Sequence, residues 1–404
     1  AAALTPVRNR IGLSATAVVV LAASLAAIAA FANPAVSEYK PIFAPLNVPE
    51  SRVLAEFRSP RGLYQLLDNF TERADTDLSN NAGQMGVQAP PRAYGLYRDG
   101  ARIAGLPRER SDAGYARAAL DGAPYALAER PRVLLFGASG GFRIAELLAL
   151  GAQQVDVVEP EPVIFAALSQ GLGPVPAFEG DPRWRLATFA EPPVRLLREH
   201  PLRAGGTGYD VIDIAGDFLG SDETNRHLYT VEAMAGLIAR LAPDGMLSVP
   251  IAIRELPVYA VRVLATVREA LRRAGVADPA AHVVVYRSAW NLRVLVSRAP
   301  WSQARLAALR AYAEERSFDL SFAPGYDALA PGRTIWNDLP AVSLESGTMS
   351  SRGEAADAVA EDAARIMAGD PPRDAFDRTP ITADRPWLSP VVRIAGLPAA
   401  LERM

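Results

Sequence analysis

The sequence predicts an α/β domain built around a largely parallel sheet, and three features lead to this fold class. The apolar run at residues 133–136 is typical of a buried parallel strand, and a glycine-rich turn and a helical pattern follow it. A second apolar run ends on Glu159, about twenty residues after that turn. Further along, only residues 288–290 separate two apolar strands, and so short a link requires an antiparallel hairpin.

The turn and the acidic residue together predict a nucleoside-binding unit. Gly137, Gly140 and Gly141 let the backbone approach a ligand closely, and Ser139 lies among them at the start of the helix. Glu159 can accept hydrogen bonds from both hydroxyls of a ribose. The spacing is Gly-x-x-Gly-Gly, so the dinucleotide-binding pattern Gly-x-Gly-x-x-Gly is not met.

The elements after this unit alternate between strands and helices. Five strand–helix units closed by a hairpin form the pattern of the S-adenosylmethionine-dependent transferase fold, a Rossmann-like sheet of seven strands with six parallel and the last antiparallel. A dinucleotide-binding domain would continue with another crossover helix. A generic α/β domain that binds no ligand is the alternative. Strands are expected at 185–189, 209–214, 245–251, 281–287 and 291–297, and helices at 162–170, 192–199, 230–241 and 258–274.

Residues 11–31 predict a transmembrane helix. The segment has no charge, and about 20 apolar residues span roughly 30 Å of hydrocarbon as a helix. Residues 29–33 also resemble a signal-peptidase site, which is the alternative to an uncleaved helix. Arg8 and Arg10 precede the segment and by themselves suggest that the soluble part lies outside.

The chain divides further where its composition and pattern change. Residues 32–50 are expected to form a linker, 51–113 a small β domain with a hairpin at Asp99-Gly100, and 114–300 the nucleoside-binding domain. Residues 301–404 are expected to be a helical and irregular extension, with 318–349 irregular. A helix is also expected at 115–128, with Gly122 and Pro124 as the positions at which it could be interrupted.

The composition excludes several classes of function. A net charge of −3 leaves no basic surface for nucleic acid. The chain has no cysteine, so disulfides, thiolate catalysis and cysteine-bound metals are excluded. The three histidines, His200, His227 and His282, lack the spacing of metal ligands, and no metal site is expected.

Several segments, taken in order, resemble the spermidine synthase (aminopropyltransferase) family, and most closely its membrane-embedded bacterial branch. The resemblance runs from about residue 39 to residue 388, and the order and spacing of the segments carry it. They are residues 59–68 and 96–100 in the small β domain, 132–146 at the glycine turn, 181–186, 209–214, 227–230 and 241–249 along the later strands, and 379–387 near the end.

This resemblance implies an aminopropyl transfer and the ligands for it. The implied nucleosides are S-adenosylmethionine, its decarboxylated form and methylthioadenosine. The attacking amine must be neutral, so a carboxylate takes its proton. The family's substrate residues correspond to Gln65 and Tyr229, and Glu159 is retained. The resemblance also implies a bacterial inner-membrane location, crossed once within this chain, with the soluble domain on the cytoplasmic side and other membrane-protein subunits as partners.

The chain departs from the family where acids are expected. Ala215 stands at the position of the catalytic aspartate after the fourth strand, and Asp217 is the nearest candidate base, with a solvated loop acid as the alternative. Ala190 replaces the acid after the third strand, and the adjacent Glu191 is a substitute for contacting the nucleoside. Arg117 stands in the pair that would bind the diamine, where a positive charge repels a dication.

Three functions are consistent with a retained fold and missing acids. The first is a membrane-anchored aminopropyltransferase with a rearranged set of acids. The second is a diverged transferase that uses S-adenosylmethionine or another nucleoside, with Glu159 on the ribose. The third, which we favour, is a catalytically inactive accessory subunit of a membrane assembly that docks through exposed aromatic residues such as Trp336 and Trp387. The alternative for these tryptophans is that they cap the core.

Overall fold

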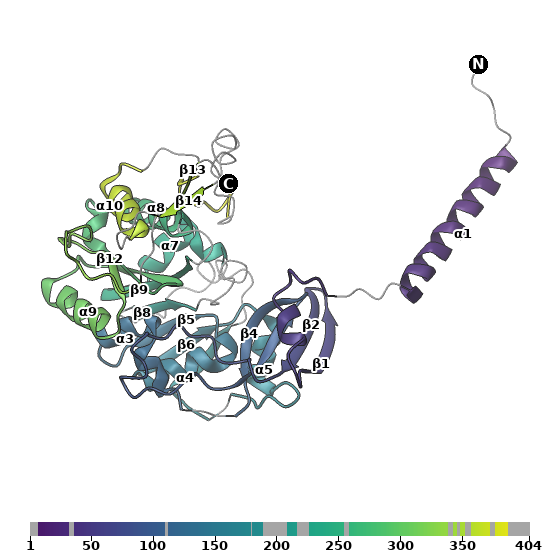
Figure 1. The fold of residues 1–404 in the computed structure, drawn as a ribbon, viewed down its shortest axis with the longest axis horizontal. Coiled ribbons are helices and arrows are strands. Elements are labelled where there is room, and N and C mark those ends of the chain that lie inside the picture. Colours follow the sequence, from purple (N-terminus) through teal and green to yellow (C-terminus); the bar gives the residue numbers. More distant parts are fainter. Residues whose placement is uncertain are drawn as a thin grey trace, which may run out of the picture.

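The computed structural model shows a small β domain, an α/β domain and an N-terminal helix (Figure 1). It describes residues 7–31, 36–109, 112–178, 180–188, 208–215, 226–253, 258–337, 342–345, 348–351, 357–371 and 376–386. The helix expected at 192–199, the candidate residues Glu191 and Asp217, and Trp387 lie outside the described residues.

An eight-stranded sheet forms the centre of the α/β domain, in the order β12-β10-β11-β9-β8-β5-β6-β7. Strands β5 to β9 are parallel, β11 is antiparallel to β9, and β10 pairs antiparallel with β11 and so runs with the parallel strands. The strands are β5 (Arg132–Phe136), β6 (Gln154–Val158), β7 (Trp184–Thr188), β8 (Tyr209–Ile214), β9 (Leu241–Ala252), β10 (Val283–Arg287), β11 (Asn291–Ser297) and β12 (Asp319–Phe322).

This strand order confirms the predicted α/β transferase-like fold. Counted from β5, the first seven strands have the order 3-2-1-4-5-7-6, whereas a dinucleotide-binding sheet has the order 3-2-1-4-5-6. The difference arises at the β10–β11 hairpin, which places β11 between β9 and β10. In its turn, the Ser288 N–H donates to the Asn291 carbonyl at 2.9 Å. The six parallel strands and the antiparallel β11 are as predicted.

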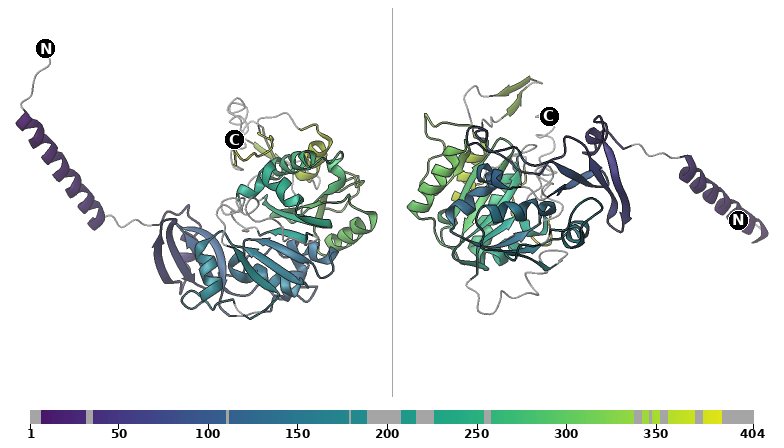
Figure 2. Two further views of the ribbon diagram at one scale, coloured as in Figure 1. Left: turned by 180° about the vertical axis from the view of Figure 1, so that it is seen from behind. Right: turned by 90° about the horizontal axis from the view of Figure 1, so that it is seen from below.

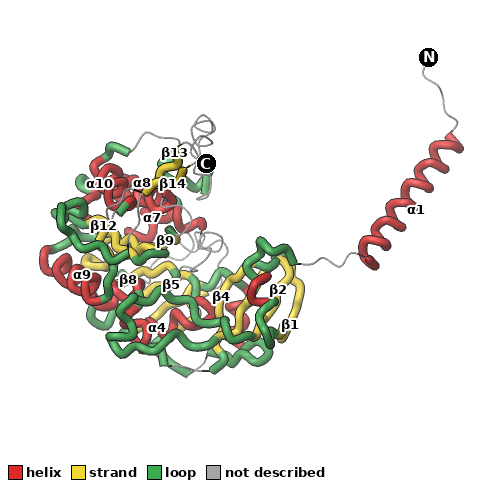
Figure 3. Tube along the Cα trace, viewed as in Figure 1, coloured by secondary structure: helices red, strands yellow, loops and turns green. Residues whose placement is uncertain are grey.

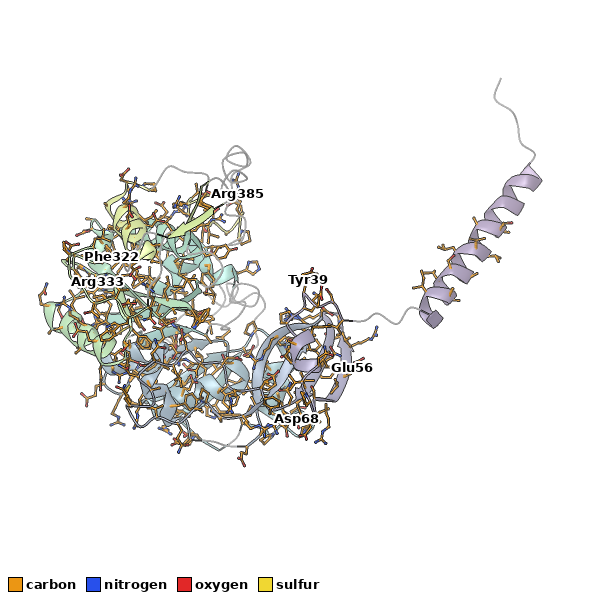
Figure 4. The ribbon with its side chains drawn as sticks, viewed as in Figure 1. Tyr39, Glu56, Asp68, Phe322, Arg333 and Arg385 are labelled. Carbon is orange, nitrogen blue, oxygen red and sulfur yellow. The ribbon has the colours of Figure 1, made fainter. Side chains whose placement is uncertain are left out.

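The predicted number of strands is corrected by β12, an eighth strand that pairs antiparallel with β10. It lies in the segment that was expected to be irregular. Its four residues are too few to show a hydrophobic period, so only its pairing with β10 identifies it. Phe322 at its end lies at the opposite side of the molecule from Glu56 of the small β domain (Figure 4).

Helices cover both faces of the sheet (Figure 3). Side chains along β8 point alternately to the two faces of the sheet, so Ile212 and Ile214 belong to the core cluster on one face and Val211 to the cluster on the other. The first cluster contains residues of α7 (Val231–Ile238), α8 (Val258–Arg273) and α10 (Ala358–Ala368). The second contains residues of α3 (Ala123–Leu127), α4 (Phe142–Ala149), α5 (Pro162–Gln170) and α9 (Gln303–Glu315).

The helix expected at 115–128 is instead broken into short pieces. Two 3-10 turns, Gly114–Ala118 and Leu120–Gly122, precede α3. Pro124 lies in the first turn of α3, where its missing N–H is tolerated, so the helix begins afresh there. A separate β-hairpin is formed near the C-terminus by β13 (Val342–Glu345) and β14 (Thr348–Ser351).

The small β domain is an antiparallel meander of four strands that packs against the glycine turn. Its strand β4 brings the Gly105 carbonyl oxygen so close to Gly140 that a β-carbon added there would lie 1.9 Å from it. A short helix, α2 (Phe43–Leu46), precedes the meander. The strands are β1 (Arg52–Ser59), β2 (Gly62–Asp68), β3 (Ala93–Arg98) and β4 (Ala101–Pro107).

The helix α1 (Val7–Phe31) stands apart from the two domains in each view (Figure 1, Figure 2). Val18, Leu21 and Ile28 are exposed on it. Among the described residues, however, no helix is long and apolar enough to cross a membrane. The predicted transmembrane helix and inner-membrane location are therefore corrected.

The contact between β4 and the glycine turn predicts a stability effect. Gly140→Ala should lower the free energy of unfolding by at least about 2 kcal/mol, because the new methyl group collides with the Gly105 carbonyl and the backbone has a φ of 67°. Gly151→Ala is the matched control, with a φ of 93° and no atom within 4 Å of an added β-carbon. It should show only the backbone cost of roughly 1 kcal/mol. Equal losses in urea unfolding would contradict the close contact.

Candidate functional site

The glycine turn lies at the carboxyl edge of the parallel strands. It follows β5 directly, and the Gly137 N–H donates to the Val158 carbonyl at the end of β6 at 2.8 Å. Gly137, Ser139, Gly140 and Gly141 all have positive φ values, of 83°, 46°, 67° and 106°. A run of left-handed backbone of this kind needs glycine at most of its positions, which explains the composition of the turn.

Glu159 lies against this turn, as the sequence predicts. One carboxylate oxygen accepts a hydrogen bond from the Ala138 N–H and the other accepts one from the Glu161 N–H, both at 2.8 Å. The side chain is 1% exposed, and this burial raises the pKa of Glu159 to about 7. The structure thus brings Glu159 and the predicted turn residues together, with the carboxylate fixing the shape of the turn.

Two glycines of the turn make close contacts with protein. Gly140 faces the Gly105 carbonyl of β4, and a β-carbon added at Gly141 would lie 3.0 Å from the ring of Phe178. The space that a side chain would need at these two glycines is therefore already occupied by protein atoms. Gly137 and Ala138, in the first part of the turn, are buried as well, and their N–H groups donate to Val158 and Glu159.

Glu161 is a further buried residue at this edge, and the sequence did not single it out. It is 1% exposed and accepts hydrogen bonds at 2.7 Å from the Tyr64 hydroxyl and from the Arg98 guanidinium, both in the small β domain. Arg61 of the same domain donates to the Pro160 carbonyl at 3.1 Å. Glu161 therefore ties the small β domain to the residue that shapes the turn. In the sequence, it indicates only the N-cap of α5.

A buried ion-pair network lies beneath the turn and centres on Asp213 of β8. This side chain is fully buried and accepts from Arg143 of α4 at 2.6 Å, from Arg293 of β11 at 3.1 Å and from the Tyr125 hydroxyl at 2.9 Å. Burial acts to raise its pKa, but the two guanidiniums outweigh burial and hold the pKa of Asp213 below its ordinary value. Asp213 is thus a charged structural residue.

The same network holds two more carboxylates. Arg143 also pairs with Asp121 at 2.8 Å and with Glu146 at 2.9 Å, and Arg293 pairs with Asp121 at 3.2 Å. Three carboxylates therefore share two guanidiniums. Burial and the charge of Asp121 raise the pKa of Glu146 to about 7, and a protonated Glu146 makes this set of five groups neutral.

The other predicted site residues are used elsewhere. Ala215 is buried, and its N–H donates to the Phe136 carbonyl at 2.9 Å. Tyr229 lies in the core and donates to the Pro250 carbonyl at 2.8 Å. Gln65 donates to Glu56 on the neighbouring strand β1 at 3.2 Å. These hydrogen bonds of Gln65 and Tyr229 do not involve residues of the glycine turn. In the described part of the chain, no cluster of three potential metal ligands occurs.

Comparisons with known proteins give structural neighbours only. No protein-family model matches the sequence, and no curated protein matches it. Spermidine synthase from Thermotoga maritima is 18% identical over 63% of this chain and 75% of that chain, with a TM-score of 0.41. A probable spermidine synthase from Corynebacterium glutamicum is 14% identical over 65% and 87%, with a TM-score of 0.44. Human methyltransferase-like protein 13, solved with SAH, is 16% identical over 55% and 94%, with a TM-score of 0.33.

The buried network predicts an unequal response to two aspartate substitutions. Asp213→Ala should lower the free energy of unfolding by about 3–5 kcal/mol, because it leaves buried guanidiniums without their shared partner. Asp181→Ala is the matched control: its pair with Arg183 is just as short, 2.6 Å, but exposed, and should cost at most about 1 kcal/mol. Urea unfolding measures both. A loss for Asp213→Ala no larger than the control would refute the structural role.

The raised pKa values of Glu146 and Glu159 predict a loss of stability with rising pH. Each group holds its proton more tightly in the folded chain, with a pKa of about 7 against 4.5 for an ordinary glutamate. The stabilisation is therefore complete below pH 4.5 and disappears as the pH rises through 7, on the order of 3 kcal/mol for each group. Denaturant unfolding between pH 5 and 8 should show this slope.

Glutamine variants test whether Glu146 and Glu159 cause this pH dependence of the free energy of unfolding. Glu146→Gln and Glu159→Gln should each remove about half of the pH dependence, because glutamine stays neutral. Glu361→Gln on α10 is the exposed control and should keep the slope of the natural protein. If neither buried variant flattens the profile, the two side chains do not carry the titration.

Proposed function

We propose that the chain is a spermidine synthase-like protein that binds a nucleoside and is related to aminopropyl or methyl transferases. One observation carries the proposal: Glu159 ends β6 at the carboxyl edge and holds the glycine turn after β5 through the Ala138 N–H. Open α/β sheets bind nucleotides in the crevice outside the carboxyl ends of such strands. The nucleosides proposed are S-adenosylmethionine, its decarboxylated form and methylthioadenosine.

The residues at Glu159 fit a ribose. A carboxylate has about four lone-pair positions, and backbone N–H groups use one on each oxygen, so acceptors are left for two hydroxyls. The carboxylate is 1% exposed beneath the contacts of Glu161 with Tyr64 and Arg98, so entry of a ligand requires these side chains to move. When bound, S-adenosylmethionine or its decarboxylated form would supply an electrophilic carbon beside its sulfonium, while the chain binds and orients the nucleoside.

We further propose that aminopropyl transfer is lost or changed. Deprotonation of the amine needs an available carboxylate near the end of β8, where this chain has Ala215. Asp213, Glu159 and Glu161 are buried, and each is engaged in hydrogen bonds. Asp217 lies outside the described residues and is the alternative base in this proposal.

A protein-binding role as an accessory subunit is the second candidate function. It is supported by Trp336, which is 49% exposed, and by Leu329, which is 56% exposed in the same segment. Large apolar side chains exposed together are typical of contact surfaces. This role and nucleoside binding are compatible, because the segment lies after β12 and not at the glycine turn.

Calorimetry with the three nucleosides tests the proposal. At least one should bind at pH 8, above the pKa of about 7 of Glu159, and Glu159→Gln should weaken its binding there by about 10- to 100-fold, the scale of a hydrogen bond to a charged group. Glu56→Gln, on the exposed side of the small β domain, is the control and should bind as the natural chain does. No binding of any nucleoside, or an unchanged dissociation constant in Glu159→Gln, would refute the site.

A second experiment measures aminopropyl transfer from decarboxylated S-adenosylmethionine to putrescine by following the release of methylthioadenosine. Turnover should be at least about 100-fold below that of a spermidine synthase measured alongside, because general-base help is worth roughly 10²–10⁴-fold. Ala215→Asp should raise it. Robust turnover that disappears in Asp217→Asn would instead establish an active enzyme with a rearranged acid.

A further inference from the structure

A polar pocket of about 190 Å³ opens at the tip of the β10–β11 hairpin. Residues 288–290 form one wall, Thr76 and Asp77 form a second, and Asn337 lies beside them. Ala252, at the carboxyl end of β9, pairs with Asn291 at the start of β11, so the pocket lies on the same edge of the sheet as the glycine turn. Its lining includes none of the described residues between the turn and α5, so it is a separate site.

Two oxygen atoms of residues that line this pocket have unused hydrogen-bonding capacity. The hydroxyl oxygen of Thr76 is buried and has no hydrogen-bond partner among the described residues. The recorded hydrogen bonds at the Asp77 carboxylate, from the Ser288 hydroxyl and the Asn291 amide, both reach Oδ2. The second oxygen, Oδ1, is left as an acceptor. A buried hydroxyl without a partner costs about 1–3 kcal/mol, which a hydrogen-bonding ligand would offset.

The other walls consist of amides and aromatic rings. The Asn80 amide donates to Asn337 Oδ1 at 3.2 Å, and the Asn337 amide donates in turn to the Ser317 carbonyl at 2.8 Å. Trp290 is half exposed at the tip of the hairpin, and Phe318 is buried behind it. The polar groups are therefore held in place before any ligand arrives, beside an aromatic surface.

The charge of the lining selects the class of ligand. Asp77 is the one charged side chain among the described residues that line the pocket, so a phosphate or a carboxylate would meet repulsion without a cationic partner. Burial raises the pKa of Asp77, which weakens its attraction for a cation. The remaining polar side chains are neutral hydroxyls and amides, which pair with groups that both donate and accept.

We propose that this pocket binds a small neutral polyol of about the size of a monosaccharide. Asp77 Oδ1 accepts from one hydroxyl of the ligand, the Thr76 hydroxyl pairs with another, and Trp290 covers the apolar face of the carbon skeleton. The site does not depend on the nucleoside function, because the two share no lining residue among those described. Either can fail without the other.

Saturation-transfer NMR and tryptophan fluorescence on the full chain test this site, with glucose, ribose and glycerol as polyol probes. Butylamine and inorganic phosphate are the cationic and anionic comparisons. At least one sugar should bind and change the indole emission. Asp77→Ala should weaken this binding by about tenfold or more, and Thr76→Val, which keeps the shape of the side chain, by about threefold or more. Glu361→Ala on α10 is the control and should bind the sugar unchanged.

The outcomes separate the proposal from its competitors. The proposal is overturned if no polyol binds at tens of millimolar. It is also overturned if Thr76→Val and Asp77→Ala both bind the sugar as tightly as the natural chain does. Binding of butylamine alone overturns it in favour of a cation site. If Asp77→Ala does not fold, Thr76→Val and Trp290→Phe test the site instead. The Thr76 hydroxyl has no hydrogen-bond partner among the described residues, so Thr76→Val removes no hydrogen bond to any of them. Loss of the fluorescence change in Trp290→Phe supports the placement of the sugar.

Discussion

The fold around the glycine turn depends on one buried carboxylate between two guanidiniums. Asp213 lies on a central strand, on the face opposite to Ile212 and Ile214, where an uncompensated charge would be strongly unfavourable. Its partners come from different elements, Arg143 from the helix after the turn and Arg293 from the closing hairpin. The pairing therefore joins the helix after the glycine turn to the closing hairpin and sets the direction in which α4 leaves the turn.

Three buried carboxylates described at this part of the molecule each hold a piece of the fold in place. Asp213 holds the helix, Glu159 holds the turn and Glu161 holds the small β domain, so each carboxylate has a structural task. A carboxylate that neutralises a buried guanidinium cannot take a proton from a substrate without exposing that charge.

The sequence predicted what depends on local pattern and missed what depends on distant partners. Apolar runs and the three-residue link at the hairpin were enough to predict six parallel strands and an antiparallel last strand, and Glu159 lies in contact with the turn. The partners of Asp213 lie 70 and 80 residues away, so a charge inside an apolar strand carried no sign of them. The packing of Gly140 on β4 was likewise hidden, because a glycine required by a neighbouring backbone looks the same as one required by a ligand.

The clasp formed by Glu161, Tyr64 and Arg98 makes the small β domain a participant in any equilibrium at the sheet edge. If the proposed nucleoside binds at Glu159, which is 1% exposed, this edge has to open, and the cost of opening then includes the bonds of Glu161 to Tyr64 and Arg98. Apparent affinity is the intrinsic affinity multiplied by the population of the open arrangement. Selection acting on the meander could therefore tune the response to a nucleoside over a wide range without altering a single contacting atom.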